Sequence, residues 1–295
     1  MRTVYLGTSS FAAAILEHLA AGDHHPQLVV TRPDRPAGRG RKLTAPPVAD
    51  AAKALQIDTF QPDDVNAPEA RERIAAATPD VLIVCAFGAL VKQDLLDAHE
   101  ILNVHPSLLP RWRGAAPIER AIMAGDDRTG VCIMRLTAGL DSGPVALTET
   151  TPIGPADTFG TLAARLEQIS GPLLTRALDE RPDYAEQVED GLTYAEKIVA
   201  ADRTLDPDAG APAMDRTVRA LTPHIGARID LGEDRGFLGV LEAHPVTAGE
   251  GGAHGSVVPQ GDRLFYGDLE LLRVQPPGGR PMDAADYVRG QANSR

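Results

Sequence analysis

The sequence predicts an α/β fold in which a parallel-sheet domain precedes a small β-barrel domain, and three observations support this prediction. Short apolar stretches alternate with helical segments through residues 4–178, which is typical of a parallel sheet covered by helices on both faces. A polar segment rich in proline and glycine, residues 202–212, then interrupts the alternation. Beyond it come short strands separated by turns, too few for a β-sandwich. We therefore expect a Rossmann-like domain over residues 1–203 and an OB-like β-barrel domain over residues 204–295.

The elements of the first domain follow from hydrophobic periodicity. Short apolar stretches predict strands at residues 4–6, 28–31, 81–85, 101–104 and 131–136. Helical periodicity predicts helices at residues 11–21, 47–55, 68–77, 117–124 and 157–178, the last capped by Asp157 or Thr158. Because right-handed crossovers join parallel strands, we expect the strands that end near Cys85, Val104 and Leu136 to deliver their loops to one edge of the sheet.

The second domain has a different pattern. A short helix is predicted near residues 214–221. Brief alternating stretches then predict strands at residues 227–231, 237–241, 256–258, 263–266 and 269–274. These strands are the basis for the predicted barrel.

The composition is that of a globular chain. Of the 295 residues, 43% are hydrophobic, which is enough for a packed core. The longest nearly apolar stretch, Val81–Val91, is shorter than the roughly 18 to 20 residues of a membrane-spanning helix. The first apolar stretch ends at Gly7, too early for a secretory signal, so we expect a cytoplasmic protein. Cys85 and Cys132 lie in apolar stretches, which predicts buried free thiols and neither a disulfide nor a metal site.

One short segment is cationic although the net charge of −12 argues against a generic nucleic-acid binder. Against the single acid Asp34, residues 32–42 contain the basic residues Arg32, Arg35, Arg39, Arg41 and Lys42. Two prolines and two glycines in this segment oppose helix and strand, so we expect an exposed loop whose arginines can pair with phosphates. From the residues alone, a solvated charged loop with no partner is an alternative.

The turn after the first strand does not fit a dinucleotide site. Residues 7–11 (GTSSF) retain only the first glycine of the G-x-G-x-x-G pattern. Without the second glycine, the backbone cannot approach a pyrophosphate closely, so we expect neither NAD nor FAD. Ser9 or Ser10 can instead cap the following helix.

Two polar stretches follow predicted strands and carry the candidate chemistry. Asn103 and His105 end one strand, and Asp141 lies just past the end of the next. A right-handed crossover between these parallel strands returns both carboxyl ends to the same edge, where open α/β sheets bind ligands. We therefore expect Asn103, His105 and Asp141 to converge.

This set of residue types suits acyl transfer. Asn103 can donate to a carbonyl oxygen that becomes an oxyanion, His105 can move protons near neutral pH, and Asp141 can orient or charge the imidazole. The sequence offers no obvious nucleophile, which favours direct transfer between two bound substrates. The alternative is that these residues only cap a strand and a turn.

Longer motifs around these residues resemble the folate-dependent formyltransferases, which move a formyl group from 10-formyltetrahydrofolate to an amine. The signature is formed by residues 103–110 (NVHPSLLP) and 140–143 (LDSG). Within that family, residues 111–118 (RWRGAAPI) and the loop of residues 32–43 resemble the methionyl-tRNA formyltransferases. The resemblance covers nearly the whole chain, because Gly7 with residues 11–12, the turn at residues 86–88 and residues 193–197 (TYAEK) match as well.

The resemblance implies a formyl transfer from 10-formyltetrahydrofolate to the α-amine of methionine on initiator tRNA, a step of translation initiation, by direct attack of the amine on the formyl carbon. It implies that Asn103, His105 and Asp141 are catalytic and that no metal takes part. The residues that it assigns to the folate are Ala86, Phe87, Gly88, Ser107, Leu108, Leu109, Pro110 and Leu140.

The resemblance also assigns the tRNA contacts. Arg32, Arg35, Arg39, Arg41 and Lys42 would recognise the acceptor end, and the C-terminal domain would bind tRNA as well. That domain has 14 acids against 10 bases over residues 201–295, so a basic face would have to be local. Its candidate residues are Arg216, Arg219, Arg228, Arg263 and Arg273. We expect a monomer without membrane attachment.

Three functions compete at this stage. The first is formylation of methionyl initiator tRNA, the second uses an amino sugar or glycinamide ribonucleotide as acceptor, and the third is RNA binding without catalysis. The cationic loop and residues 111–118 favour the first over the second. The complete set of Asn103, His105 and Asp141 argues against the third.

Overall fold

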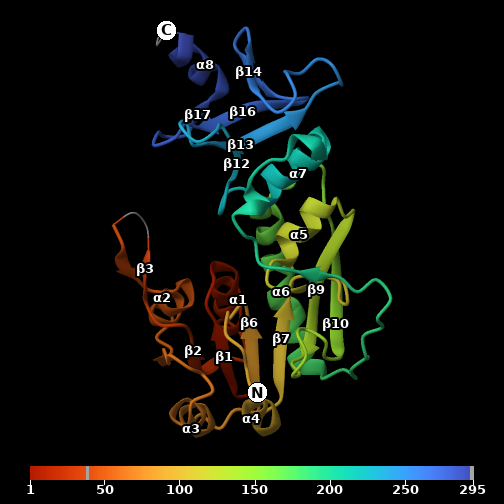
Figure 1. Ribbon diagram of the computed structural model, residues 1–295. Coiled ribbons are helices and arrows are strands. Elements are labelled where there is room, and N and C mark those ends of the chain that lie inside the picture. The colour runs from red at the N-terminus through yellow and green to blue at the C-terminus, as the bar shows by residue number, and fades with distance from the viewer. Residues whose placement is uncertain (38–39, 293–295) are drawn as a thin grey trace. The chain divides into compact units, whose positions relative to one another are not determined.

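The computed structural model describes residues 1–37 and 40–292, and the chain divides into two compact units (Figure 1). The first unit consists of Met1–Pro117, Thr129–Thr151 and Ala163–Ala195, and the second of Ile118–Arg128, Pro152–Leu162 and Glu196–Arg295. Each unit contains its own sheet and its own cluster of buried apolar side chains.

A seven-stranded sheet in the order β10-β9-β7-β6-β1-β2-β5 forms the centre of the first unit. Its strands are β1 (Thr3–Gly7), β2 (Pro26–Val30), β5 (Thr59–Phe60), β6 (Val81–Cys85), β7 (Ile101–His105), β9 (Arg128–Arg135) and β10 (Val145–Pro152). Neighbours from β5 to β7 pair in parallel. Every residue of β1, β6 and β7 is buried, which explains their continuous apolar sequences. The predicted α/β class is confirmed, and the sheet that we predicted as parallel is parallel from β5 to β7.

One strand runs in the direction opposite to the prediction. β9 pairs with β7 antiparallel, with Cys132 opposite His105 and Arg135 opposite Leu102. The prediction that β7 and β9 end at the same edge of the sheet is therefore wrong. The connecting helix α5 (Pro117–Ala124) is only about 12 Å long, and β9 begins again at the edge where β7 ends (Figure 1).

All five predicted helices of the first 180 residues are present. They are α1 (Ser10–Ala20), α2 (Pro47–Ala54), α3 (Pro68–Ala76), α5 and α6 (Phe159–Glu180). The Ser9 Oγ caps α1 by accepting the Ala12 N–H, and the Thr158 Oγ1 accepts the Thr161 N–H at the start of α6. The six-residue helix α4 (Gln93–Ala98) escaped prediction because it is too short for a helical pattern.

The cationic segment is a β-hairpin rather than the loop we expected. Strands β3 (Arg35–Ala37) and β4 (Lys42–Thr44) pair antiparallel and bond to no other strand among the described residues. Pro36 is tolerated because this two-stranded ribbon consists of edges, where a missing N–H need not break a ladder. A second small pair joins β8 (Arg113–Gly114) to β11 (Tyr194–Ala195) in parallel.

The second unit contains a separate antiparallel sheet, built from the strands that we predicted for a small barrel. Its strands are β12 (Ala227–Asp230), β13 (Phe237–Pro245), β16 (Leu269–Gln275), β15 (Arg263–Tyr266) and β14 (Val257–Gln260), in that spatial order, with β17 (Met282–Asp283) beside β16. Two short 3₁₀ helices, η1 (Ala201–Arg203) and η2 (Pro207–Ala209), precede α7 (Ala211–Leu221), and α8 (Ala284–Ala292) follows the sheet. Leu238, Val240 and Leu271 of the sheet share one buried cluster with Met214 and Val218 of α7.

Within the described part of the chain, none of the helices combines the length and the apolar character that crossing a membrane requires.

Candidate active site

Strand β7 carries two polar side chains among apolar neighbours. Asn103 and His105 are alternate residues, so their side chains leave the same face of the strand. Both residues are buried, at 7% and 4% exposure. Burying a polar group without a partner costs roughly 1 to 3 kcal/mol, so the contacts of these two residues show what holds them.

Asp141 comes from the loop between β9 and β10 and meets both residues. Its Oδ1 accepts a hydrogen bond from Asn103 Nδ2 at 3.3 Å, and its Oδ2 lies 3.7 Å from His105 Nδ1. The same Oδ2 accepts the backbone N–H of Gly114 at 2.9 Å. The structure thus brings Asn103, His105 and Asp141 together, although the antiparallel β9 delivers Asp141 by a route that the sequence did not indicate.

His105 is oriented by a backbone carbonyl. Its Nε2 lies 2.9 Å from the oxygen of Trp112. Because a carbonyl oxygen can only accept, this contact assigns the proton of the neutral imidazole to Nε2 and leaves the lone pair on Nδ1. Since Nδ1 is the atom that faces Asp141, its lone pair lies on the side of the carboxylate.

The backbone around this cluster is held in an uncommon conformation. Ala86, Trp112 and Asp141 have φ angles of 42°, 64° and 44°, in the left-handed region that few non-glycine residues adopt. Such conformations persist where surrounding contacts fix them, and they gather at sites that position chemical groups. All three residues belong to turns or loops that carry predicted site residues or contact them.

The residues assigned to the folate separate into two groups. Ala86, Phe87 and Gly88 border a surface groove of about 480 Å³, whose walls also include Thr8, Arg32 and Pro46. The Phe87 side chain belongs to the hydrophobic core and is 3% exposed, while its carbonyl accepts a hydrogen bond from the Thr8 hydroxyl. Phe87 is therefore both a core residue and part of the groove.

The second group, Ser107–Pro110 and Leu140, does not line this groove. Ser107 is fully buried, and its hydroxyl donates to the Arg111 carbonyl at 2.7 Å, so it closes a turn and does not act as a nucleophile. Leu108, Leu109 and Pro110 are partly exposed in that turn. The Leu140 side chain is 61% exposed beside Asp141.

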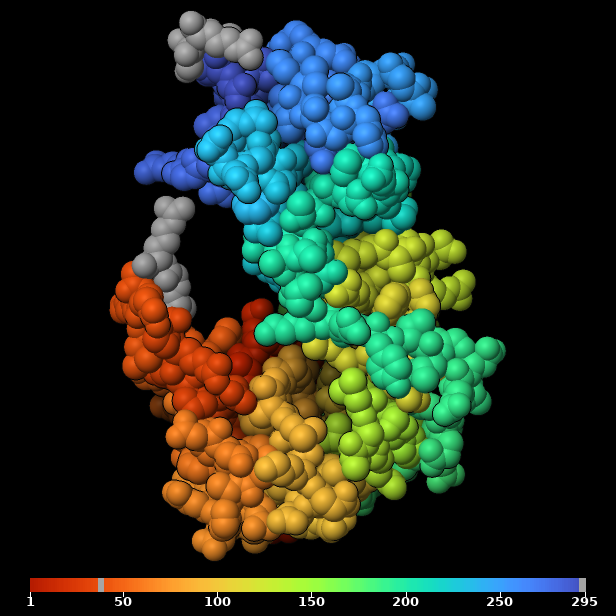
Figure 2. All heavy atoms as spheres, in the orientation of Figure 1, coloured from red at the N-terminus to blue at the C-terminus, as the bar shows by residue number. Residues whose placement is uncertain are grey.

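The cationic hairpin lies at the surface of the first unit (Figure 2). Arg35, Arg41 and Lys42 are exposed, and none of them forms an ion pair with a described acid. Arg32 is partly buried at the base, where its NH1 donates to the Gly88 carbonyl at 3.4 Å. Arg39 lies outside the described residues.

Sequence reasoning missed the segment that braces this site. Gln187 donates to the carbonyls of Asp141 and Gly143 and accepts from the buried Arg113 guanidinium. The Thr193 hydroxyl accepts a hydrogen bond from the Trp112 N–H, and the Thr193 carbonyl accepts one from the Arg113 N–H. A single glutamine in a polar stretch gives no periodic signal, and the match at residues 193–197 was the only pointer to this segment.

In the second unit, the candidate basic residues divide by their partners. Arg219 and Arg263 form ion pairs with Asp215 and Glu270, which neutralise them. Arg228 instead stacks over the Phe237 ring at 3.7 Å and donates to the Thr204 hydroxyl. Phe237 is 41% exposed, and with Arg203 and Arg228 it lines a surface hollow of about 360 Å³.

The cysteines behave as structural residues. Cys85 and Cys132 are buried free thiols, and burial raises the pKa of Cys85 to about 12. Burial also raises the pKa of Cys132, while the nearby Thr148 hydroxyl lowers it. Within residues 1–37 and 40–292, no group of three His, Cys, Asp or Glu side chains could hold a metal ion.

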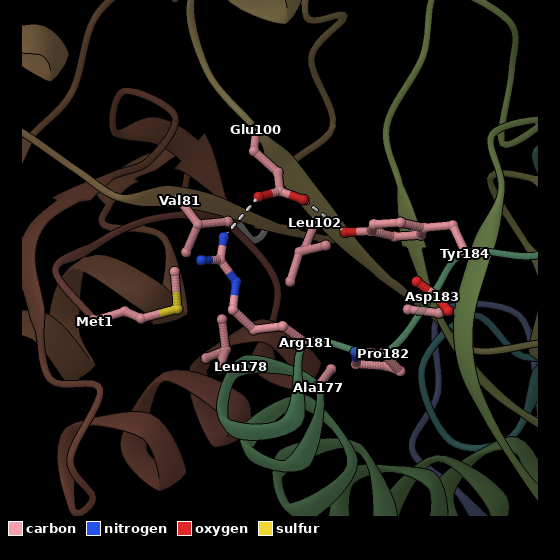
Figure 3. A pocket seen from close by; sticks show the side chains of 11 residues that line it. Met1, Val81, Glu100, Leu102, Ala177, Leu178, Arg181, Pro182, Asp183 and Tyr184 are labelled. Atoms are coloured by element: carbon pink, nitrogen blue, oxygen red, sulfur yellow. Dashed lines mark hydrogen bonds and ion pairs between the residues drawn. The ribbon is translucent and has the colours of Figure 1, made fainter.

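A second polar cluster lies at the amino end of β7 (Figure 3). Glu100 accepts a hydrogen bond from the Tyr184 hydroxyl at 2.8 Å and pairs with Arg181 at 3.2 Å. These residues line a pocket of about 200 Å³ together with apolar side chains that include Val81, Leu102 and Leu178. Figure 3 shows Arg181 and Tyr184 both directed at the Glu100 carboxylate, so these three polar groups bond to one another.

Comparisons with known proteins agree with this architecture. Residues 1–178 match the family described as formyl transferase, and residues 197–292 match its C-terminal domain. The chain is 43% identical over 303 residues to the methionyl-tRNA formyltransferase of Halorhodospira halophila, covering 98% of this chain and 96% of that relative.

Two solved structures share the fold. Phosphoribosylglycinamide formyltransferase from Bacillus halodurans is 28% identical with a TM-score of 0.52, over 61% of this chain and 95% of that one. HypX from Aquifex aeolicus, solved in complex with tetrahydrofolic acid, is 17% identical with a TM-score of 0.67, over 98% of this chain and 47% of that one.

Proposed function

The chain is a transferase of the formyl transferase family, and we propose that it moves a formyl group from 10-formyltetrahydrofolate to the α-amine of methionine carried by initiator tRNA. The observation that carries this proposal is the meeting of Asn103, His105 and Asp141 at 3.3 and 3.7 Å in a chain of this family. The sequence resemblance to folate-dependent formyltransferases is confirmed.

The transfer proceeds by direct attack of the amine nitrogen on the formyl carbon. A new carbon–nitrogen bond forms, the carbonyl oxygen becomes negative, and the bond to the folate nitrogen N10 then breaks. The amine gives up a proton and the leaving nitrogen takes one, so atoms and charge balance without an enzyme-bound formyl group. 10-Formyltetrahydrofolate supplies the formyl carbon, and the protein positions it and moves the proton.

Each of the three side chains has a distinct role in this scheme. The Asn103 amide has two N–H groups, so one can donate to the developing oxyanion while the other keeps its contact with Asp141. His105 takes the amine proton at Nδ1 and returns it to the leaving nitrogen, while Nε2 stays bound to the Trp112 carbonyl. Asp141 stabilises the imidazolium and does not act as an independent acid.

The groove beside Ala86–Gly88 fits part of the folate. Its lining offers backbone groups of a turn, the apolar Ala86, and the hydroxyl-bearing Thr8 and Ser9. A volume of about 480 Å³ lies within the range of small-molecule sites. Ser107–Pro110 and Leu140 would complete the folate contacts from the side of Asp141.

We assign recognition of the tRNA acceptor end to the hairpin. Arg35, Arg41 and Lys42 are exposed and lack described acidic partners, so their charge is available for phosphates. Arg32 connects the base of the hairpin to Gly88 of the groove, and Arg39 belongs to the same cationic set. Both substrates would thereby be held next to one sheet edge.

A second tRNA contact is proposed for the C-terminal domain, which we place at residues 204–295 after a catalytic domain of residues 1–203. Arg228 and its stacked partner Phe237 combine a cation with an exposed aromatic face. This pairing suits phosphate contact together with stacking. We further propose a cytoplasmic monomer.

The experiment that tests the function is an acceptor comparison. Formyl transfer from 10-formyltetrahydrofolate is measured with methionyl initiator tRNA, free methionine, glycinamide ribonucleotide and an amino-sugar nucleotide. The proposal expects transfer to the charged tRNA at a kcat/KM far above that for any small acceptor. A small acceptor that matches or exceeds the tRNA would overturn it.

A further inference from the structure

Gln187 makes four hydrogen bonds with its one amide group, and all four reach the walls of the candidate active site. Its Nε2 donates to the Asp141 carbonyl at 2.8 Å and to the Gly143 carbonyl at 2.7 Å. Its Oε1 accepts from Nε and NH2 of Arg113 at 3.0 and 2.8 Å. An amide has two N–H groups and one oxygen with two lone pairs, so this side chain is saturated.

The two walls that Gln187 joins hold the reacting side chains. One wall is the backbone on either side of Arg113. There the Trp112 carbonyl accepts from His105 Nε2, and the Gly114 N–H donates to Asp141 Oδ2. The other wall is the loop that carries Asp141 itself. Gln187 therefore fixes the distance between the groups that orient His105 and the residue that faces it.

The Asp141 loop needs such a brace. Asp141 has a φ of 44°, which costs a non-glycine residue free energy unless neighbouring contacts impose it. Two carbonyls of this loop, those of Asp141 and Gly143, share the same amide donor. Without that donor, no group of the described residues bonds to these two carbonyl oxygens. The loop can then relax, and Asp141 can leave the left-handed region.

The contact with Arg113 explains why residue 187 is a glutamine. Arg113 is 8% exposed, and no carboxylate of the described residues lies within ion-pair distance of it, so the Gln187 oxygen is its acceptor. A glutamate would pair with Arg113 but could not donate to the two carbonyls. A methionine would fill the space but could do neither. Glutamine alone among residues of this size accepts on one side and donates twice on the other.

We infer that Gln187 is a positioning residue for the formyl transfer, acting through Asp141 and through the Trp112 carbonyl that orients His105. The expected effect on formyl transfer rests on the proposed function. The positioning of His105 and Asp141 rests on the four hydrogen bonds alone.

The test compares Gln187→Met and Gln187→Glu with the wild type and with Gln93→Met. Gln93 is a matched control, because its exposed amide donates only to Asp97 on α4 within the described part of the chain. We expect both Gln187 variants to lose roughly 10- to 100-fold in kcat, as supporting residues around a site commonly do, with KM for tRNA and folate changed less than about three-fold. Gln93→Met should keep wild-type kinetics.

A pH series separates positioning from general damage. When the carboxyl group of Gln187→Glu is protonated, it regains one donor for the loop carbonyls. Because the ion pair with Arg113 favours the carboxylate, this proton is taken up below the ordinary glutamate pKa of about 4.3. The ratio of its kcat to that of the wild type should therefore rise as the pH falls below that value, whereas the ratio for Gln187→Met should stay flat. A flat ratio for both variants, or a kcat of Gln187→Met equal to that of the wild type, would overturn the inference.

A spectroscopic measurement makes the inference independent of the acceptor. The proton on His105 Nε2, bonded to the Trp112 carbonyl, is observed by NMR in wild type and in Gln187→Glu, which keeps the shape of the side chain should Gln187→Met fail to fold. A shifted or lost signal supports positioning even if the wild type proves inactive on tRNA, in which case only the proposed function falls. An unchanged signal in the folded variant overturns the positioning role.

Discussion

The two ends of strand β7 carry polar clusters of opposite construction. At the carboxyl end, Asn103 and His105 approach Asp141 at 3.3 and 3.7 Å, while the backbone holds His105 and Asp141 at 2.9 Å each. At the amino end, the Glu100 side chain binds the Tyr184 hydroxyl at 2.8 Å and Arg181 at 3.2 Å. The first cluster is fixed by the main chain, and the second is fixed by its own side chains.

This difference separates a cluster with polar atoms available to a substrate from a cluster whose polar atoms bond to one another. Because backbone groups hold His105 and Asp141, polar atoms such as His105 Nδ1 and the second N–H of the Asn103 amide stay available to a substrate. In the Glu100 cluster the polar atoms are already paired, and Arg135 also stacks on the Tyr184 ring at 4.1 Å. Burial, followed by the bond to Glu100, raises the pKa of Tyr184, so the phenol keeps its proton. A closed cluster of this kind predicts stability and no chemistry.

The largest effect should come from breaking the carboxyl-end cluster. Loss of one oxyanion donor lowers turnover by roughly 100- to 1000-fold, and loss of a general base by about 100- to 10000-fold. Asn103→Ala and His105→Ala should therefore be folded and nearly inactive in single-turnover formyl transfer. Circular dichroism confirms folding, and near-normal turnover in either variant would remove that residue from the mechanism.

A second prediction concerns coupling within the same cluster. If Asp141 works through His105, the effects of the two substitutions should not multiply. The double variant Asp141→Asn with His105→Ala should then resemble the worse single variant in kcat. Multiplied losses in this cycle would instead show that Asp141 acts on the substrate by itself.

The fold was largely predictable because each signal was local. The strands at residues 81–85 and 263–266 and the helix at residues 117–124 have the predicted bounds, since uninterrupted apolar or helical periodicity defines them. The direction of β9 was not predictable in the same way. The direction of β9 depends on which edge of the sheet the connection from β7 returns to, and residues 106–127 contain no pattern that predicts that edge.

The meeting of three polar side chains was predictable from the sequence, and the groups that support them were not. Asn103, His105 and Asp141 are rare polar residues at strand ends, which makes them visible in a sequence. Gln187, the Trp112 carbonyl and the Gly114 N–H contribute through geometry that only the fold creates. The hairpin shows the same limit, because cross-strand pairing of β3 with β4 outweighed the local preferences of Pro36.

A third, intermediate effect is expected at the cationic hairpin. Each lost phosphate contact lowers the slope of log K against log salt by about 1. Arg41→Ala and Lys42→Ala should each bind charged tRNA more weakly and with a shallower slope, while folate affinity stays the same. Arg2→Ala is the control, because that exposed arginine is already paired with Asp80. Unchanged slopes, or a folate defect as large as the tRNA defect, would return the acceptor question to a small molecule.

The smallest effect, and the sharpest contrast with the catalytic variants, is expected for Tyr184→Phe. The substitution removes one hydrogen bond to a charged group and should lower the free energy of unfolding by about 1.5 to 3 kcal/mol while kcat and KM stay within about two-fold of the wild type. Urea unfolding and the formyl-transfer assay measure the two quantities on one preparation.

The pH dependence of stability adds a signed test of the same cluster. Because the pKa of Tyr184 is higher in the folded protein than its ordinary value of 10.0, the folded state binds this proton more tightly, and stability should fall as the pH rises above about 10. Tyr184→Phe has no such proton, so its stability should fall less steeply over that interval, by the share that Tyr184 contributes. If Tyr184→Phe instead lost activity at neutral pH without losing stability, the amino end of β7 would be a functional site, and the contrast between main-chain and side-chain support would not distinguish the two clusters.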